Sequence, residues 1–456
     1  MYVARGLPVC HADGRVARHP RPRVMGYTAA AHHRVQEHVE DNAHSPHPNE
    51  HRRVPAWVRA VAVLACGWVV IWVARMMFTP VYPELSAFFG GATSAELGAI
   101  SSWYFLGYAL MQIPSGLLVD RIGMRRVVIP GFLLFALGTA IMAGAHSLSM
   151  LYLGNVLAGV GSGTFYGIAY TITNTRIPAR RKSLATAIVN SGTAVGSGLG
   201  IASASSLVST GFISWQMLAG ITGALALAMV VVFAKSLPKK HGASAKTSDT
   251  PVGKTFTVHL AAACVLYFAT LYLYYLISTW LPDFLHVERA FDASFAGAAS
   301  IAVFLAGIPG ALVAGRIADR HPKRQIALIV ALEIAAALAL LPLIFGQGMP
   351  TAAIGAIAYG FFGKLAVEPL IISWLGARTS TARMTTTFGI FNFFGMSASV
   401  FAPLVTGILA DATGSDIPGF LTALAILALG IIAFLVILAA HGRRAGSHRT
   451  QARDSR

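Results

Sequence analysis

The chain has 456 residues, of which 55% are hydrophobic and 12% are charged, and its mean hydropathy is +0.64. Soluble domains carry about twice this share of charged residues, so the composition excludes an ordinary soluble protein. A formal net charge of +17 is typical of nucleic-acid-binding proteins. However, the sequence shows neither an aromatic platform nor a zinc-ligand spacing, so we expect no nucleic acid as a partner.

Residues 1–55 are polar, rich in Arg and His, and poor in large apolar residues. They lack the apolar core of a signal peptide, and their composition predicts a disordered cytoplasmic tail. A metal-binding or regulatory tail is the alternative that this composition leaves open. Cys10, Cys66 and Cys264 form no ligand or disulfide spacing, so the sequence predicts no metal site and no cofactor.

Long apolar runs follow one another from Trp57 onward, each near the length that a helix needs to cross a bilayer. Glycines inside the runs favour close helix packing, and a β-barrel would show short alternating strands instead. We therefore predict an all-α membrane protein with twelve transmembrane helices. The predicted spans are 57–80, 97–118, 127–145, 150–173, 184–207, 214–234, 257–282, 294–315, 325–344, 352–375, 384–410 and 418–440.

The first span contains Arg75, eight residues before Pro83 and too deep for the side chain to reach the interface easily. Its guanidinium is permanently charged and offers a planar fork of donors, which suits a carboxylate or a phosphonate-like group. A charge in the hydrocarbon region is costly and therefore indicates a functional site. We favour substrate binding, and a structural ion pair with a carboxylate on another span is the alternative.

The second span carries Tyr104, Tyr108 and Gln112 four residues apart on one face, a pattern that suits a wet cavity. Near its end, Gly116 and Asp120 also share a face. Glycine lets a neighbouring helix approach, and a carboxylate at the membrane edge can accept hydrogen bonds from the N-terminus of that neighbour. These features predict close contact with another helix at this end of the span.

The loop after this span contains Arg121, Gly123, Arg125 and Arg126. We expect its arginines to pair with Asp120 or with lipid phosphate. Such contacts would lock one conformation and would have to break in the other, which predicts a gate. A basic turn that only sets the membrane topology is the alternative interpretation.

A polar stretch at residues 235–256 is the longest between spans and divides the chain six plus six. The halves repeat weakly, because Pro83-Glu84 recurs as Pro282-Asp283 at an offset of 199 residues. Gly116, Asp120 and Arg121 recur as Gly315, Asp319 and Arg320 at the same offset. We predict an N-terminal bundle at 56–234, a cytoplasmic linker at 235–256, a C-terminal bundle at 257–440 and a cytoplasmic tail at 441–456, with a binding site between the bundles.

Basic residues gather in alternate loops and in both tails, whereas the opposite loops contain Arg289 as their only Lys or Arg. This asymmetry predicts that both termini and the basic loops lie in the cytoplasm. Richness in Ala, Gly and Arg points weakly to a bacterium, and so to a bacterial inner membrane.

Further polar side chains fall inside other spans. Tyr267, Tyr274 and Ser278 share a face of the seventh span. Asn190 in the fifth span and Asn392 in the eleventh occupy similar places in the two halves. As a set with the stripe of the second span, they predict a polar cavity. Each of them taken singly fits ordinary contact between helices equally well.

The tenth span carries Lys364 and Glu368 on one face, followed by Pro369, which predicts a bend. Two interpretations stay open for the pair. It is either a self-contained buried ion pair, or Lys364 is a second contact to an anion and Glu368 carries a proton. Glu333 in the ninth span is isolated, and we expect a structural or interfacial role for it.

The loop after the second span resembles a signature of the major facilitator superfamily, G-x-L-a-D-r-x-G-r-k. The matching segment is Gly116-Leu117-Leu118-Val119-Asp120-Arg121-Ile122-Gly123-Met124-Arg125-Arg126, and its weaker second copy is Gly315-Arg316-Ile317-Ala318-Asp319-Arg320. The resemblance implies a fold of two six-helix pseudo-repeat bundles over residues 57–440 and transport by alternating access.

Three segments resemble the anion:cation symporter branch of this superfamily, which transports organic anions. They are Arg75 in its span, Tyr274-Tyr275-Leu276-Ile277-Ser278-Thr279-Trp280-Leu281-Pro282, and Asn392 and Gly395 together with Ala410-Asp411-Ala412-Thr413-Gly414-Ser415. The branch often has an acid before the first-span arginine and another in the fourth span, where this chain has Ala74 and Ser162. Proton coupling has therefore either moved, with Glu368 as the leading candidate, or is absent.

Together these features predict a monomeric transporter of a small organic anion, with the lipid bilayer as its other partner. Arg75 would bind the anion, and Lys364 would assist. A drug or metabolite exporter of the same superfamily is one alternative, although the glycine run of the fifth span lacks the proline of the drug-antiporter signature. A non-transporting membrane receptor is another. No nucleophile–base pair or metal cluster indicates an enzyme.

Overall fold

The computed structural model describes residues 55–208, 210–237 and 256–454. These ranges are helical apart from short connections and contain no strand, which confirms the predicted all-α fold class. The predicted tail at 1–55 lies almost wholly outside the described residues, as does most of the predicted linker at 235–256.

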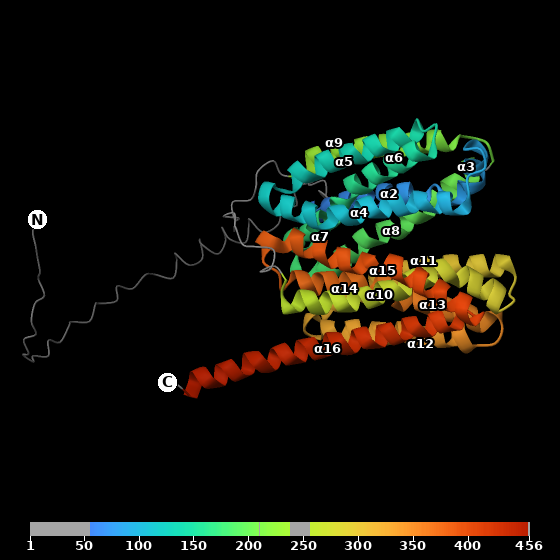
Figure 1. Ribbon diagram of the computed structural model, residues 1–456. Helices are drawn as coiled ribbons and strands as arrows, with labels where there is room; N and C mark the ends of the chain where they lie inside the picture. The colour runs from blue at the N-terminus through green and yellow to red at the C-terminus, as the bar shows by residue number, and fades with distance from the viewer. Residues whose placement is uncertain (1–54, 209, 238–255, 455–456) are drawn as a thin grey trace, which may run out of the picture. The chain divides into compact units, whose positions relative to one another are not determined.

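The first half of the described chain runs from α2 to α9 (Figure 1). Its elements are α2 (Ala56–Met76), η1 (Thr79–Val81), α3 (Tyr82–Phe88), α4 (Ser94–Ile122), α5 (Met124–Ala143), α6 (Leu148–Gly163), α7 (Phe165–Arg176), η2 (Ala179–Arg181), α8 (Lys182–Ser203), η3 (Ala204–Val208) and α9 (Trp215–Ser236).

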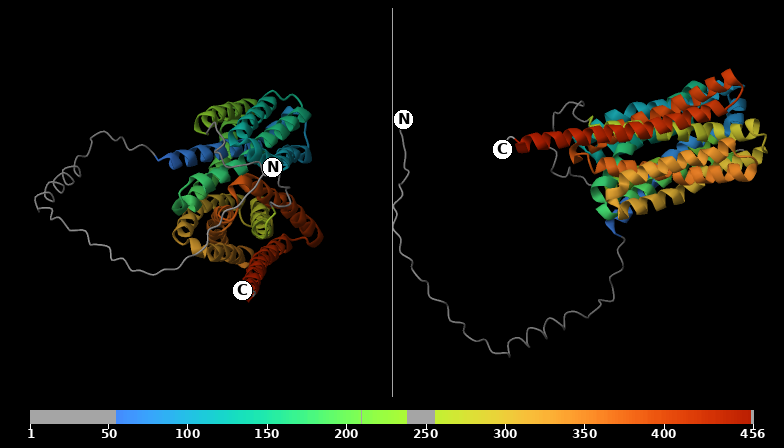
Figure 2. Two further views of the ribbon diagram at one scale, coloured as in Figure 1. Left: turned by 90° about the vertical axis from the view of Figure 1, so that its left-hand side faces the viewer. Right: turned by 90° about the horizontal axis from the view of Figure 1, so that it is seen from below.

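The second half runs from α10 to α16. Its elements are α10 (Val258–Asp283), η5 (Phe284–Glu288), α11 (Ala293–Arg320), η6 (Pro322–Arg324), α12 (Gln325–Phe345), α13 (Met349–Phe362), α14 (Lys364–Gly376), η7 (Thr381–Arg383), α15 (Met384–Thr413) and α16 (Ile417–Asp454). Helix α16 extends beyond its neighbours, past residue 440 where the sequence predicted the end of the bundle (Figures 1 and 2).

Ten helical segments of the described residues are long and apolar enough to cross a membrane. They coincide with ten of the predicted spans. The second predicted span falls in α4, and the fourth falls in α6 and α7, which are not among these ten. The chain is therefore a multi-pass helical membrane protein, and the count of twelve spans stays a prediction.

Side chains at the N-caps supply partners for the first backbone N–H groups of several helices, which have none within the helix. Thr93 forms a capping box with Glu96 at the start of α4, and Ser214 and Thr257 cap α9 and α10. Helices α8 and α15 receive no such bond from their own N-cap side chains. Their first turns therefore need acceptors from elsewhere in the protein.

Two predicted spans are interrupted in the middle. The fourth breaks at Thr164, between α6 and α7, and the tenth breaks at Gly363, between α13 and α14. The two positions differ by the same 199 residues as the repeated motifs. Pro369, where the sequence predicted a bend, lies inside α14, and that bend stays a prediction. The interruption of the span comes earlier, at Gly363, where the backbone leaves the helical region with a ψ of −149°.

The two halves meet closely at two pairs of crossing helices, α4 with α15 and α11 with α8. A Cβ atom added to Gly116 would lie 2.7 Å from Thr386 Cα, and one added to Gly315 would lie 2.9 Å from Leu184 Cα. Both positions lie at the crossing, where any side chain would collide with the backbone of the other half. Glycine is therefore required at both for this packing.

We expect Gly116→Ala to open the contact between α4 and α15, because the added methyl group meets backbone that cannot move independently. The Thr171 and Thr385 hydroxyl oxygens lie 3.1 Å apart next to this crossing, so cysteines at both positions should form a disulfide in a background without native cysteines. Gly116→Ala should lower the yield of this cross-link.

Gly98→Ala is the matched control on the same helix, since an added Cβ there has no neighbour within 4 Å. Alanine favours a helix by about 1 kcal/mol over glycine, so the control should fold at least as well as the parent. Equal cross-link yields in the two variants would contradict the proposed tight crossing.

Candidate functional site

The first turns of α8 and α15 are capped by aspartates from the opposite half. Asp120 of α4 accepts bonds from the backbone N–H groups of Thr385 (3.3 Å) and Thr386 (2.9 Å), and from the Thr386 hydroxyl (2.6 Å). Asp319 of α11 accepts from the N–H groups of Ser183 (2.8 Å) and Leu184 (2.9 Å). The positive ends of these two helices therefore attract the carboxylates that the superfamily signature supplies.

Two further polar contacts between the halves involve Ser183 and Thr385, whose N–H groups the two aspartates bond. The Ser183 and Ser373 hydroxyls are 3.0 Å apart and join α8 to α14, as Thr171 and Thr385 join α7 to α15. Together with the two aspartate caps, these contacts link the two halves at one end. We call this set of contacts the closed edge.

The arginines of the signature do not take part in the closed edge. Within the described part of the chain, Arg121, Arg125 and Arg126 make no hydrogen bond or ion pair, so the expected pairing with Asp120 is not observed. Gly123 has a φ of 97° in the turn between α4 and α5, which explains glycine at this point of the motif. Arg320 ends α11 as Arg121 nearly ends α4.

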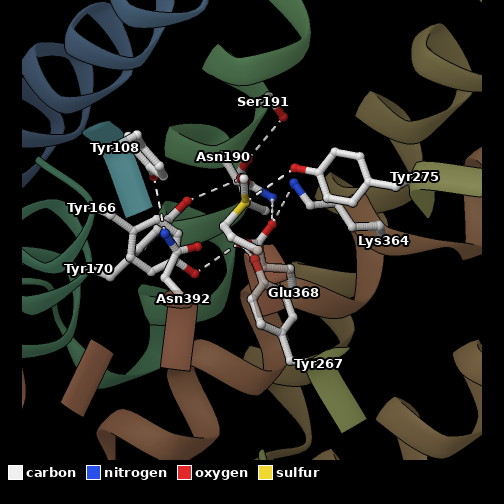
Figure 3. A network of polar contacts seen from close by, with 12 residues as sticks. Tyr108, Tyr166, Tyr170, Asn190, Ser191, Tyr267, Tyr275, Lys364, Glu368 and Asn392 are labelled. Carbon is white, nitrogen blue, oxygen red and sulfur yellow. Dashed lines mark hydrogen bonds and ion pairs between the residues drawn. The ribbon is translucent and has the colours of Figure 1, made fainter. Parts of the chain in front are cut away.

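The carboxylate of Glu368 is bonded by side chains of four helices (Figure 3). Its Oε1 accepts from the hydroxyls of Tyr166 (3.0 Å) and Tyr267 (2.5 Å). Its Oε2 accepts from Asn190 Nδ2 (3.0 Å) and forms an ion pair with Lys364 Nζ (2.8 Å). Tyr166 and Asn190 belong to the first half and the other two partners to the second, so a single buried carboxylate joins the halves in the interior.

The local fold explains how Lys364 and Glu368 meet. The break at Gly363 makes Lys364 the first residue of α14, and Glu368 follows one turn later on the same face. A lysine at the N-terminus of a helix is disfavoured by the helix dipole. Its pairing with Glu368 compensates for this, and the ring of Tyr274 lies 5.2 Å from the ammonium nitrogen.

Two asparagines cross between the halves at corresponding places. Asn190 of α8 reaches Glu368 and also accepts a bond from Tyr170 at 3.1 Å. Asn392 of α15 donates in the opposite sense, to the Tyr108 hydroxyl at 3.1 Å. Figure 3 shows both asparagines in the same polar network. The sequence placed these two residues in equivalent positions, and the structure brings both to the interface of the halves.

Arg75 is the buried cation for which the structure shows no acidic partner. Its side chain is 6% exposed, and its guanidinium carbon lies 4.1 Å from the ring centres of Trp72 and Phe105 and 4.9 Å from that of Tyr108. Its Nε and Nη2 have no hydrogen-bond partner among the described residues. The structural ion pair that the sequence left open is thus not formed, since Glu368 pairs with Lys364.

The remaining predicted site residues lie at varying distances from this network. Tyr104 donates to Ser162 (2.8 Å), and its ring lies 5.7 Å from the Arg75 guanidinium. Gln112 bonds the backbone carbonyl of Tyr108 in its own helix, and Ser278 bonds that of Tyr275. These last two contacts are typical of helix stabilisation, so the structure gives Gln112 and Ser278 no contact with the network.

Sequence reasoning missed Tyr166 and Tyr170 as members of the network. They are four residues apart at the start of α7, immediately after the break at Thr164. The signal was available as a tyrosine pair at helical spacing, but it could not show which helix the pair would face. Glu333, which the sequence left isolated, is buried in α12 and accepts a hydrogen bond from the Thr270 hydroxyl of α10.

With this geometry described, comparison with known proteins identifies the family. The sequence profile of the Major Facilitator Superfamily matches residues 64–403 and 263–454, and the chain belongs to this superfamily of membrane transporters. It is similar to the probable sulfoacetate transporter SauU of Cupriavidus necator, with 27% identity over 384 residues, covering 76% of this chain and 86% of that protein.

The chain is also similar to the 3-(3-hydroxy-phenyl)propionate transporter of Escherichia coli, with 26% identity over 353 residues, covering 75% of this chain and 85% of that one. Among solved structures it resembles the transporter FucP in the outward conformation, with a TM-score of 0.69, 17% identity, and coverage of 84% and 99%. It likewise resembles the human organic anion transporter MFSD10, with a TM-score of 0.68, 17% identity, and coverage of 84% and 100%. These two likenesses show the fold.

We expect Asp120→Asn to weaken the closed edge, because the amide keeps an acceptor but loses the charge that complements the N-terminus of α15. A loss of about 1–2 kcal/mol corresponds to about a 5- to 30-fold change in the ratio of closed to open states. A Ser183→Cys/Ser373→Cys disulfide across the other seam should then form more slowly in membranes.

Asp411→Asn provides the control, since it removes an exposed carboxylate from α15 that makes no hydrogen bond among the described residues. Its cross-linking rate should match that of the parent. Unchanged cross-linking in Asp120→Asn would show that the cap does not hold the halves together.

The contrast between Arg75 and Lys364 predicts opposite effects on stability. Lys364→Gln leaves Glu368 buried without its cation, which costs about 3–5 kcal/mol and should lower the melting temperature clearly. Adding Glu368→Gln should restore most of the loss. Arg75→Gln should leave the melting temperature nearly unchanged, because no acidic partner is left behind. Thermal unfolding of the purified variants tests this, and a large destabilisation by Arg75→Gln would reveal a structural ion pair.

Proposed function

We propose that this protein is a secondary transporter that carries a small organic anion, recognised through a carboxylate, across a bacterial inner membrane by alternating access. Arg75 carries the proposal, because its guanidinium is buried and two of its nitrogens lack hydrogen-bond partners among the described residues. A permanent charge in this environment needs an anion in at least one state of the cycle. The two relatives named above are transporters of organic acids, which supports the same substrate class here.

The anion would lie where the two halves meet, in contact with Arg75 and near Tyr274 and Tyr275. The ring of Tyr274 lies 5.2 Å from Lys364 Nζ, and Figure 3 draws Tyr275 in the network that contains Lys364 and Glu368. The rings of both tyrosines, and those of Trp72 and Phe105, suit the apolar body of an organic acid. The halves, 56–234 and 257–440, would rock about this point to open one side and then the other, and the monomer would suffice for transport.

We place the closed edge, both termini and the linker at 235–256 in the cytoplasm, since the basic residues of the sequence gather in these loops. In that orientation the structure corresponds to a state with its cytoplasmic side closed. The substrate would then enter from the opposite side, and its passage into the cell would require the bonds of Asp120 and Asp319 to break.

Glu368 is the group that we propose to carry a coupling proton. An ionised carboxylate accepts all four of its present bonds, whereas a protonated one gains a donor and loses its attraction for Lys364. Because the bonds from Tyr166 and Asn190 cross between the halves, protonation would loosen their link. Ser162, where related symporters often have an acid, instead accepts a bond from Tyr104.

The substrate class is tested by anion binding to Arg75 variants. A ligand that raises the melting temperature of the purified protein in a screen of organic acids should bind Arg75→Lys about 5- to 150-fold more weakly. This range corresponds to about 1–3 kcal/mol for a charged hydrogen bond, because lysine keeps the charge but loses the planar fork. The melting temperature of the ligand-free variant should not change.

Arg289→Lys is the matched control, as Arg289 bonds the backbone carbonyl of Gly346 away from the network. It should leave anion affinity unaltered. Normal affinity in both Arg75→Lys and Arg75→Gln would remove the reason for assigning an anionic substrate.

A further inference from the structure

Three buried charges lie in or beside the polar network where the halves meet, with the Arg75 guanidinium carbon 4.9 Å from the ring centre of Tyr108 in that network. Arg75, Lys364 and Glu368 are 6%, 8% and 1% exposed, respectively. Lys364 and Glu368 are in contact at 2.8 Å and neutralise one another, which leaves Arg75 as the single uncompensated charge of this network. Glu333 is the other buried glutamate of the described helices, and it lies apart on α12, bonded by Thr270.

Each of the two cations lies beside an aromatic ring at the interface of the halves. The Arg75 guanidinium carbon lies 4.9 Å from the ring centre of Tyr108, and the ring of Tyr274 lies 5.2 Å from Lys364 Nζ. Figure 3 shows Tyr108 and Lys364 within one polar network. A small molecule whose carboxylate binds Arg75 therefore has its far end directed toward rings and toward Lys364. Whether that far end can be anionic depends on whether the Lys364 ammonium is already paired with Glu368.

Charge balance determines whether the far end of the ligand is neutral or carries a second anionic group. While Glu368 is ionised, a second anionic group would be buried beside a pair that is already neutral, and an uncompensated buried charge is strongly disfavoured. With the charge of Glu368 removed, Lys364 becomes a second lone cation. A second carboxylate on the ligand would then be its natural partner.

We propose that Glu368 determines how many anionic groups the substrate carries: the site binds organic monoanions while Glu368 is ionised, and organic dianions when its charge is absent. This inference rests on the proposed binding of an organic anion at Arg75. It assigns Glu368 as a specificity-determining residue through its effect on Lys364, whether or not Glu368 also moves a proton.

A matched pair of ligands tests the inference at constant pH. The probes are 3-phenylpropanoate and 3-(4-carboxyphenyl)propanoate, which share a skeleton and differ by one carboxylate. Their dissociation constants are measured by calorimetry on the full chain in lipid nanodiscs. The parent protein should bind the monoanion at least tenfold more tightly, and Glu368→Gln should change the ratio by at least tenfold in favour of the dianion.

Two control variants separate charge from other effects. Glu333→Gln removes a buried carboxylate outside the network and should leave the ratio unchanged. Lys364→Gln combined with Glu368→Gln returns the network to a single cation, and so should restore the preference for the monoanion. This double variant also controls for the hydrogen bonds that Glu368→Gln alters.

The outcomes distinguish this inference from the proposed function. A parent protein that binds the dianion as tightly as the monoanion would overturn the inference while supporting anion binding, and this measurement needs no variant to fold. An unchanged ratio in Glu368→Gln would overturn it as well. Failure of the parent to bind any organic acid in the screen would instead overturn the proposed function.

Discussion

The structure depends on the burial of one carboxylate. Glu368 lies in the interior, where an ion without partners would cost several kcal/mol, and side chains from α7, α8, α10 and α14 together supply the four partners that it needs. Two of these helices belong to each half of the chain. The same carboxylate therefore links the halves and neutralises Lys364, so that Arg75 is the buried cation without an acidic partner among the described residues.

The sequence repeat also produces matching pairs of contacts elsewhere between the two halves. Asp120 and Asp319 cap helices of the opposite half, and Asn190 and Asn392 each cross the interface. The two halves differ in the buried charges that they contribute to the proposed anion site. The first half contributes the lone Arg75, and the second contributes the Lys364–Glu368 pair, so a ligand between them would meet one charged and one neutral surface.

Much of this could be predicted from local patterns. Apolar runs located the membrane-spanning segments, although not the breaks at Thr164 and Gly363 or the length of α16. Four-residue spacing placed Lys364 beside Glu368 and Gly116 beside Asp120, because these relations lie within one helix. Relations between helices could not be predicted in this way. Tyr267 belonged to the predicted polar set, but its bond to Glu368 and that of Tyr166 depend on which faces meet. The aromatic surroundings of Arg75 and the isolation of Arg121 from Asp120 depend on this as well. The break at Gly363 was missed because proline is the stronger local signal.

The central claim is that an organic anion binds to Arg75, and a structure of the complex tests it most directly. The full chain in lipid nanodiscs, saturated with 3-bromophenylpropanoate, would be solved by electron cryomicroscopy, and the bromine would fix the orientation of the acid. We predict the carboxylate within hydrogen-bond distance of the Arg75 guanidinium, with the ring beside Tyr274 and Tyr275. An acid bound elsewhere, or one whose carboxylate contacts Lys364 while Arg75 stays enclosed by its aromatic neighbours, would contradict the account.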